Sequence, residues 1–92
     1  MTEKVTRRME IVNEKGLHAR AAAKLVEVVE GFDATAEVSH NGQSASGDSI
    51  MGLLMLAAAK GSTIDVEIAG FDAEPLADAM AALIADRFGE DM

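Results

Sequence analysis

The chain reads GLHARAAAKLV over residues 16–26, where a polar loop ends and a predicted helix begins. Backbone N–H groups at the start of a helix have no intrahelical acceptor, and the helix dipole adds partial positive charge there. Such a helix start is suited to binding phosphate. His18 adds a ring nitrogen at this position, and Arg20 adds a guanidinium whose donors match phosphoryl oxygens. The stretch therefore predicts that His18 carries a phosphoryl group and that Arg20 binds it.

The helix that follows is predicted over residues 19–30. Apolar side chains recur at the i, i+3, i+4 and i+7 spacing of a single buried face, at Ala22, Leu25, Val26 and Val29. Gly31 is expected to end this helix.

Alternating apolar and polar residues predict four strands, over residues 5–12, 34–39, 43–46 and 63–69. Arg7 interrupts the apolar row of the first strand, which favours a place at the sheet edge. Asn41-Gly42 predicts a hairpin between the second and third strands, because a type I′ turn needs positive φ at both central residues.

Two further helices are predicted, over residues 49–58 and 73–88. Ser49 and Asp72 stand where a capping side chain is expected. The second helix has too many apolar residues for a surface helix with a single buried face. Some of its apolar side chains are therefore expected to be exposed for a functional reason. The inner stripe of the last helix is predicted from five residues: Leu76, Ala79, Met80, Leu83 and Phe88.

The predicted order is β-α-β-β-α-β-α, within one domain spanning residues 1–92. Apolar and polar side chains alternate in residues 63–69, which requires one face of the sheet to be exposed to solvent. The helices are therefore expected to cover the other face. The fold class predicted is α+β, with a four-stranded antiparallel sheet covered on one face by three helices.

Charge is unevenly distributed along a chain of 92 residues with a net charge of −8. Residues 1–24 hold six basic and three acidic side chains, and residues 25–92 hold two basic and thirteen acidic ones. An acidic chain with three Phe and no Trp or Tyr is a poor candidate for binding nucleic acid. No apolar run is long enough to span a membrane, cysteine is absent, and no secretory signal is recognisable, so a cytoplasmic protein is expected.

By these residues, the chain resembles the HPr family, the histidine-containing phosphocarriers of the bacterial phosphoenolpyruvate-dependent phosphotransferase system. Residues 16–20, Gly-Leu-His-Ala-Arg, are similar to the family's active-site signature. Residues 48–52, Asp-Ser-Ile-Met-Gly, are similar to its second signature, around a regulatory serine. The resemblance covers essentially the whole chain and implies an open-faced β-sandwich.

The resemblance implies a role for each matching residue. His18 would accept a phosphoryl group on Nδ1 from phosphorylated Enzyme I and pass it to an enzyme IIA component, and Arg20 would hold the phosphoryl oxygens. Ser49 would be the target of an HPr kinase/phosphorylase in hosts that have one. Residues expected to dock partner proteins are Ile50, Met51, Leu54 and Lys24.

Two positions depart from the family pattern. Ala21 stands where the family usually has proline, which should loosen the start of the helix slightly. Asp48 precedes the serine where a basic residue is common, which would weaken attraction to an acidic Enzyme I surface or disfavour phosphorylation of Ser49. No cofactor and no metal site are expected, and a monomer is the expected state.

Two alternatives stay open. One is a nitrogen-type regulatory phosphorelay that is not coupled to sugar transport, which the Ala-Arg-Ala variant of the motif favours mildly. The other is a regulatory binding module with the same fold and no relay. An independent enzyme is disfavoured, because no paired carboxylates, nucleophile–base set or glycine-rich nucleotide loop appears.

Overall fold

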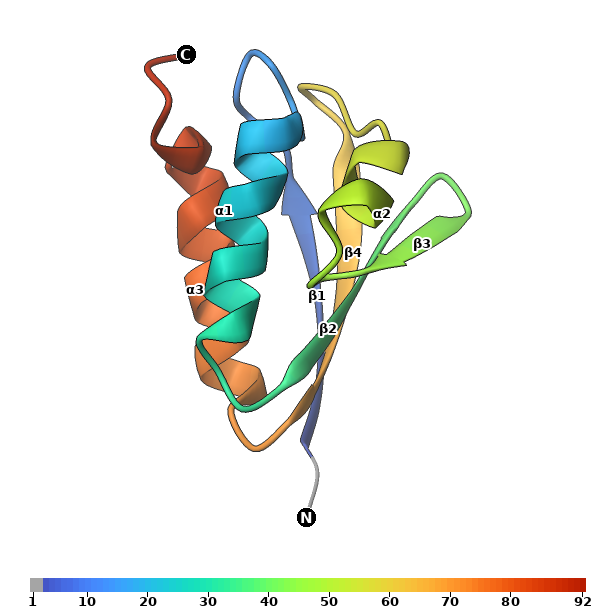
Figure 1. The fold of residues 1–92 in the computed structure, drawn as a ribbon, viewed down its shortest axis with the longest axis vertical. Helices are drawn as coiled ribbons and strands as arrows, with labels where there is room; N and C mark the ends of the chain where they lie inside the picture. The colour runs from blue at the N-terminus through green and yellow to red at the C-terminus, as the bar shows by residue number, and fades with distance from the viewer. Residues whose placement is uncertain (1–2) are drawn as a thin grey trace.

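Four antiparallel strands form one sheet in the order β1-β4-β2-β3 (Figure 1). The computed structural model describes residues 3–92, with Glu3 described by its backbone only. The strands are β1 (Glu3–Glu10), β2 (Thr35–His40), β3 (Gln43–Ser46) and β4 (Thr63–Gly70). The helices are α1 (Ala19–Glu30), α2 (Ile50–Met55), α3 (Ala73–Ala85) and a 3₁₀ turn, η1 (Arg87–Gly89). The predicted order of elements is confirmed.

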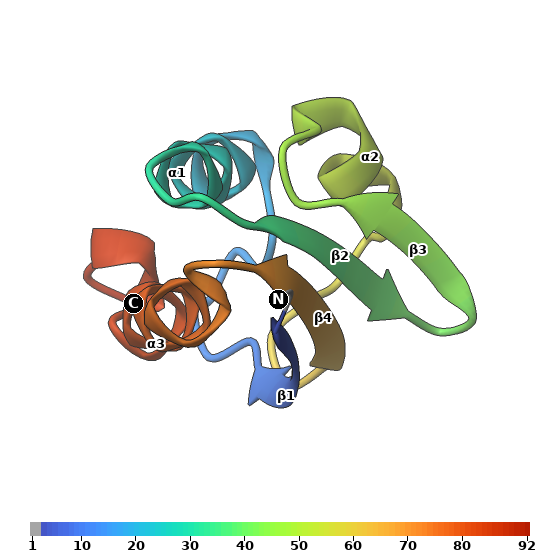
Figure 2. The same cartoon turned by 90° about the horizontal axis from the view of Figure 1, so that it is seen from below.

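The three α-helices lie on one face of the sheet and leave the other face open (Figure 2). The residue pattern of strand β4 explains why the helices cover one face only. Ile64, Val66 and Ile68 are fully buried beneath the helices. Asp65 and Glu67 are exposed on the other face. The predicted open-faced α+β arrangement is therefore confirmed.

Strand β1 forms one edge of the sheet, as the interruption at Arg7 predicted. The Arg7 guanidinium pairs with Glu74 at 2.7 Å and with Asp78 at 3.3 Å, both on α3. The strand ends at Glu10 instead of residue 12. Ile11 still exchanges backbone hydrogen bonds with the turn before β4, at 2.9 Å to Ser62 and 2.7 Å from Gly61.

The second helix is shorter than predicted. It ends at Met55, because the chain turns into the left-handed region at Ala57, where φ is 53°. Leu56 and Ala58, on either side of Ala57, are both buried. The predicted end at residue 58 is thus wrong.

The last helix is also shorter than predicted, since α3 ends at Ala85 and Phe88 lies in η1 with φ of 54°. Its fully buried side chains are Ala73, Leu76, Ala77, Met80 and Ile84. Ala79 and Leu83, which were predicted to be on the inner stripe, are only partly buried. Asp72 stands at the N-cap, but its carboxylate accepts the N–H of Asp33 at 2.8 Å and does not cap the helix.

Phe88 is the largest of the fully buried side chains. It anchors the C-terminal end of the chain to a core otherwise built from aliphatic residues and Met. Figure 1 shows the consequence, with the C-terminal tail beside the loop that leads into α1. No helix in residues 3–92 has the length and apolar character needed to cross a membrane.

Candidate functional site

The loop before α1 is held against the turn that follows α2. Leu17 is buried and donates its N–H to the carbonyl of Ala58 at 2.9 Å. Gly16 has φ of +68°, and a Cβ there would lie 2.6 Å from the same Ala58 oxygen. Glycine is therefore required here for its backbone conformation and for its lack of a side chain. The result is that His18 is placed at the N-cap of α1.

His18 is partly exposed, with 27% of its side chain accessible, and it makes one side-chain contact within the described chain. Its Nε2 forms a hydrogen bond with Oε2 of Glu90. No hydrogen-bond partner for Nδ1 is found in residues 3–92. The two ring nitrogens are thus in different environments, one engaged and one open.

Glu90 is itself held by Asn13, a fully buried residue of the loop before α1. The Asn13 amide donates to Oε1 of Glu90 at 2.9 Å and to the carbonyl of Gly16 at 2.8 Å. These hydrogen bonds lower the pKa of Glu90, that from His18 having the larger effect and that from Asn13 the next. Glu90 is therefore a carboxylate at neutral pH.

Contacts from the N-terminal half hold the C-terminal tail in this position. The Lys24 ammonium donates to the carbonyl of Phe88 at 2.5 Å, and the N–H of Glu14 donates to the carbonyl of Met92 at 3.0 Å. Lys24 was predicted to dock partners, and the structure places its ammonium in a contact within the chain. A docking role for Lys24 stays a prediction.

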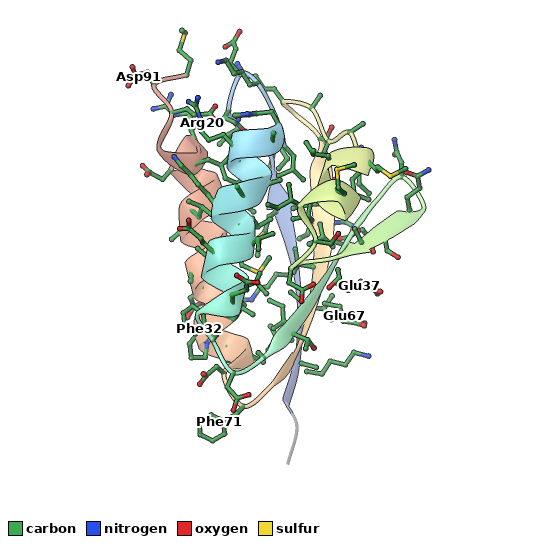
Figure 3. All side chains as sticks on the ribbon, in the orientation of Figure 1. Arg20, Phe32, Glu37, Glu67, Phe71 and Asp91 are labelled. Carbon is green, nitrogen blue, oxygen red and sulfur yellow. The ribbon has the colours of Figure 1, made fainter. Side chains whose placement is uncertain are left out.

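Arg20 is exposed at the start of α1, at the same end of the molecule as Asp91 of the tail (Figure 3). Both line a hollow of about 380 Å³ between the loop, α1 and the tail. Among residues 4–92, no hydrogen bond or ion pair to the Arg20 guanidinium is found. Its donors are thus available to an anion.

The charge around this hollow differs from what the sequence suggested. Three basic residues of the N-terminal region line it, and three acidic residues stand beside them: Lys15, Arg20 and Lys24, with Glu14, Glu90 and Asp91. The excess of basic residues in residues 1–24 is therefore offset at this hollow, because the acidic C-terminal tail folds back onto it.

Ser49 caps α2, as predicted, and its Oγ accepts the N–H of Gly52 at 3.1 Å. The adjacent Asp48 accepts a hydrogen bond from the Ser46 hydroxyl at 2.5 Å. This contact keeps a carboxylate in the turn immediately before Ser49.

The exposed apolar side chains of α2 form a patch made of Ile50, Met51 and Met55. They are 40%, 68% and 74% accessible, whereas Leu53 on the opposite side of the helix is fully buried. Leu54, predicted to be part of this surface, is only partly exposed. Met55, which was not among the predicted docking residues, is the more exposed of the two methionines.

Sequence reasoning missed Asn13 and Glu90. The two residues stand 77 positions apart, and neither lies in a recognisable motif. No group of three or more His, Cys, Asp or Glu side chains that could hold a metal ion occurs in the part of the chain that the structure describes.

Comparison with known proteins places these features in a family. Residues 5–86 match the family model described as "PTS HPr component phosphorylation site". The phosphocarrier protein HPr of Cupriavidus necator is 49% identical over 80 residues, which cover 87% of this chain and 90% of that protein. The phosphocarrier protein NPr of Escherichia coli K12 is 44% identical over 92 residues, which cover 99% and 100%. The crystal structure of HPr-C-His from Thermoanaerobacter tengcongensis has a TM-score of 0.87 and 33% identity, covering 98% of this chain and 99% of that one.

Proposed function

The chain belongs to the HPr family of phosphocarriers, which are relay components of the phosphotransferase system and not independent enzymes, and we propose that His18 is its phosphoryl acceptor. The observation that carries this proposal is the environment of the His18 ring at the start of α1. Nε2 is engaged by Glu90 while Nδ1 has no partner within residues 3–92, so Nδ1 is the nitrogen available to a donor.

The transfer needs only the lone pair of Nδ1. This nitrogen attacks the phosphorus of the phosphorylated donor, an N–P bond forms, and the bond between phosphorus and the donor breaks with its electron pair on the donor. No proton has to leave Nδ1, so no general base is needed within the chain. This agrees with a carrier that has no nucleophile–base pair of its own.

Arg20 would bind the phosphoryl oxygens once they are on His18. Its guanidinium stands two residues from His18, is exposed, and lines the hollow beside Glu90. Arginine offers several donors in a planar fork, which suits phosphoryl oxygens better than the single ammonium of lysine.

The family implies Enzyme I as the donor and enzyme IIA components as acceptors. The α2 patch is proposed to dock both, because an exposed apolar cluster near a charged centre is the arrangement of a transient interface. Phosphate on Ser49 would add about −1.5 to −2 charges beside this patch and weaken docking. Such a carrier would act in the cytoplasm, where its phosphoryl donor is produced.

The comparisons include relatives from two branches of the relay and do not distinguish between them. One branch serves sugar uptake, and the other is the nitrogen-type regulatory branch. The HPr of Cupriavidus necator has the higher identity, and the NPr of Escherichia coli matches over nearly the full length of both chains. Incubating the phosphorylated chain with purified IIA proteins of each branch would separate them, since only the cognate IIA protein should accept the phosphate quickly.

The central test is intact mass after incubation with Enzyme I, Mg²⁺ and phosphoenolpyruvate. The wild-type chain should gain one acid-labile phosphate, and His18→Ala should gain none. His40→Ala is the matched control, because His40 contacts the carbonyl of Thr63 in the sheet and should be dispensable. A wild-type chain that gains no phosphate from Enzyme I of its own host would refute the relay and favour a binding module.

A further inference from the structure

We propose that Glu90, held in place by the buried amide of Asn13, is a positioning residue that keeps the ring proton of His18 on Nε2 and leaves the Nδ1 lone pair free for phosphoryl transfer. This inference rests on the proposed function for its effect on transfer, although the state of the ring can be tested without any transfer.

The first step is the direction of the hydrogen bond between His18 and Glu90. A carboxylate has acceptor sites only, so the ring nitrogen that contacts it must donate. A neutral imidazole carries one proton, and if that proton is on Nε2 the lone pair is on Nδ1. The lowered pKa of Glu90 supports the same direction, because it keeps the group ionised at neutral pH.

The second step is the orientation of Glu90. Asn13 directs both hydrogens of its amide toward acceptors, Oε1 of Glu90 and the carbonyl of Gly16. The opposite orientation of the amide would place an oxygen against two acceptors, so the donor side must face Glu90. The amide thereby links the carboxylate directly to the loop that presents His18.

The Asn13 side chain has a structural cost, which makes a purely structural role a weaker explanation. It is fully buried, and its Oδ1 has no hydrogen-bond partner in the described part of the chain. Burying a polar side chain among apolar neighbours is unfavourable unless its hydrogen bonds compensate. Holding Glu90 against His18 gives this residue a function that an apolar side chain could not supply.

The arrangement predicts an unusual result for the isosteric variant Glu90→Gln. Asn13 donates to the Oε1 position, so the amide oxygen of glutamine should be retained there. The amide NH₂ would then face Nε2 of His18 and donate to it. This would move the ring proton to Nδ1, the nitrogen that must attack phosphorus.

The experiment measures two quantities on the full chain for wild type, Glu90→Gln, Glu90→Ala and Asp86→Asn. One is the tautomer of the His18 ring from ¹⁵N chemical shifts at a pH where the ring is neutral. The other is the initial rate of phosphorylation by Enzyme I and phosphoenolpyruvate. Asp86→Asn is the matched control, since it neutralises an exposed carboxylate of the same C-terminal region that does not line the hollow beside Arg20. Thermal unfolding confirms that each variant is folded.

The proposal expects wild type and Asp86→Asn to show the proton on Nε2 and to react alike. Glu90→Gln should show the proton mainly on Nδ1 and react slower by on the order of tenfold or more. Glu90→Ala, which leaves the ring free, should fall between them. A structural role alone predicts the reverse order, with the isosteric glutamine harmless and alanine the slower variant.

The proposal is overturned if Glu90→Gln keeps the proton on Nε2 or reacts at the wild-type rate. It is also overturned if Glu90→Gln reacts slowly while its tautomer is unchanged. Failure of the proposed function has a different signature, because the wild-type chain would then take no phosphate on His18 while the tautomer measurement would still report what Glu90 does to the ring.

Discussion

Asn13 donates a hydrogen bond to Glu90 across 2.9 Å, although 77 positions separate them in the chain. The contact joins the loop before α1 to the C-terminal tail, and through Glu90 it reaches the ring of His18. The site therefore consists of both ends of the chain and not of the helix start alone.

Removing the anchor of the tail should destabilise the protein and disturb His18. Phe88 is fully buried, so Phe88→Ala is expected to lower the free energy of unfolding by about 3–5 kcal/mol, as deletion of a buried aromatic ring does. Urea unfolding measures this value. Phe71→Ala is the control, because Phe71 is 80% exposed and its truncation should change stability little. Equal losses in the two variants would contradict the packing described.

The glycine before His18 should tolerate no side chain. Gly16→Ala would force alanine into a positive φ, which costs about 1–2 kcal/mol, and would push Cβ into the carbonyl of Ala58 at 2.6 Å. Gly42→Ala shares the positive φ but meets no atom within 4 Å, so it isolates the backbone cost. We expect the Gly16 variant to lose about 1–3 kcal/mol more than the Gly42 variant in chemical denaturation. Similar losses of stability in the two variants would show that the loop before α1 adjusts to accommodate the added Cβ.

Stability should depend on pH through Glu90. Its pKa is lowered in the folded chain, first by the hydrogen bond from His18, so the folded state binds the proton less readily than the unfolded state does. The stabilisation is therefore present above the unfolded value of about 4.3 and is lost as pH falls through the lower folded value.

The comparison of wild type with Glu90→Gln by thermal unfolding between pH 7 and pH 3 checks this prediction. The stability difference between the two should shrink as the solution becomes acidic. Asp91→Asn, for which no such hydrogen bond is seen among residues 3–92, serves as the control. A difference that is constant over this range would contradict the prediction.

Ser49 has a structural role and a proposed regulatory role, which two substitutions can separate. Ser49→Ala removes the acceptor for the Gly52 N–H and should cost about 1 kcal/mol of stability. Ser49→Asp retains a capping oxygen, so its stability should stay near the wild-type value, while the added charge should weaken binding to Enzyme I. Denaturation and titration calorimetry provide the two readouts. An aspartate variant that binds Enzyme I normally would argue against charge as the regulatory device.

The exposed methionines of α2 should matter for binding but not for stability. Met55→Ser and Met51→Ser remove side chains that are 74% and 68% exposed, so each should leave the unfolding free energy nearly unchanged. Each should weaken binding to Enzyme I by about tenfold if it is an anchor of the interface. Phe71→Ser is the matched control, because Phe71 is exposed at the end of the molecule opposite to Arg20 (Figure 3). Equal weakening by Phe71→Ser would contradict a docking site on α2.

Local patterns in the sequence determined the order of elements, the open sheet face and the capping role of Ser49. Local periodicity in the sequence predicts which side chains are buried, because it depends only on residues a few positions apart. Examples are the alternation in residues 63–69 and the helical spacing of Ala22, Leu25, Val26 and Val29. Helix ends were less predictable. Ala57 and Phe88 adopt positive φ, and neither residue type signals such a turn.

The position of His18 and Arg20 at the start of α1 was also predictable, because both stand in one short stretch of sequence. Asn13 and Glu90 were not, since nothing in the sequence brings a buried amide of one terminus to a carboxylate of the other. The C-terminal tail is held against the loop before α1 by two features. Phe88 is buried in the core, and Lys24 donates a hydrogen bond to the Phe88 carbonyl. The sequence by itself thus determined that His18 and Arg20 stand together at a helix start as the candidate residues, and only the tertiary structure decided which nitrogen of His18 is left open, because that depends on contacts across the whole chain.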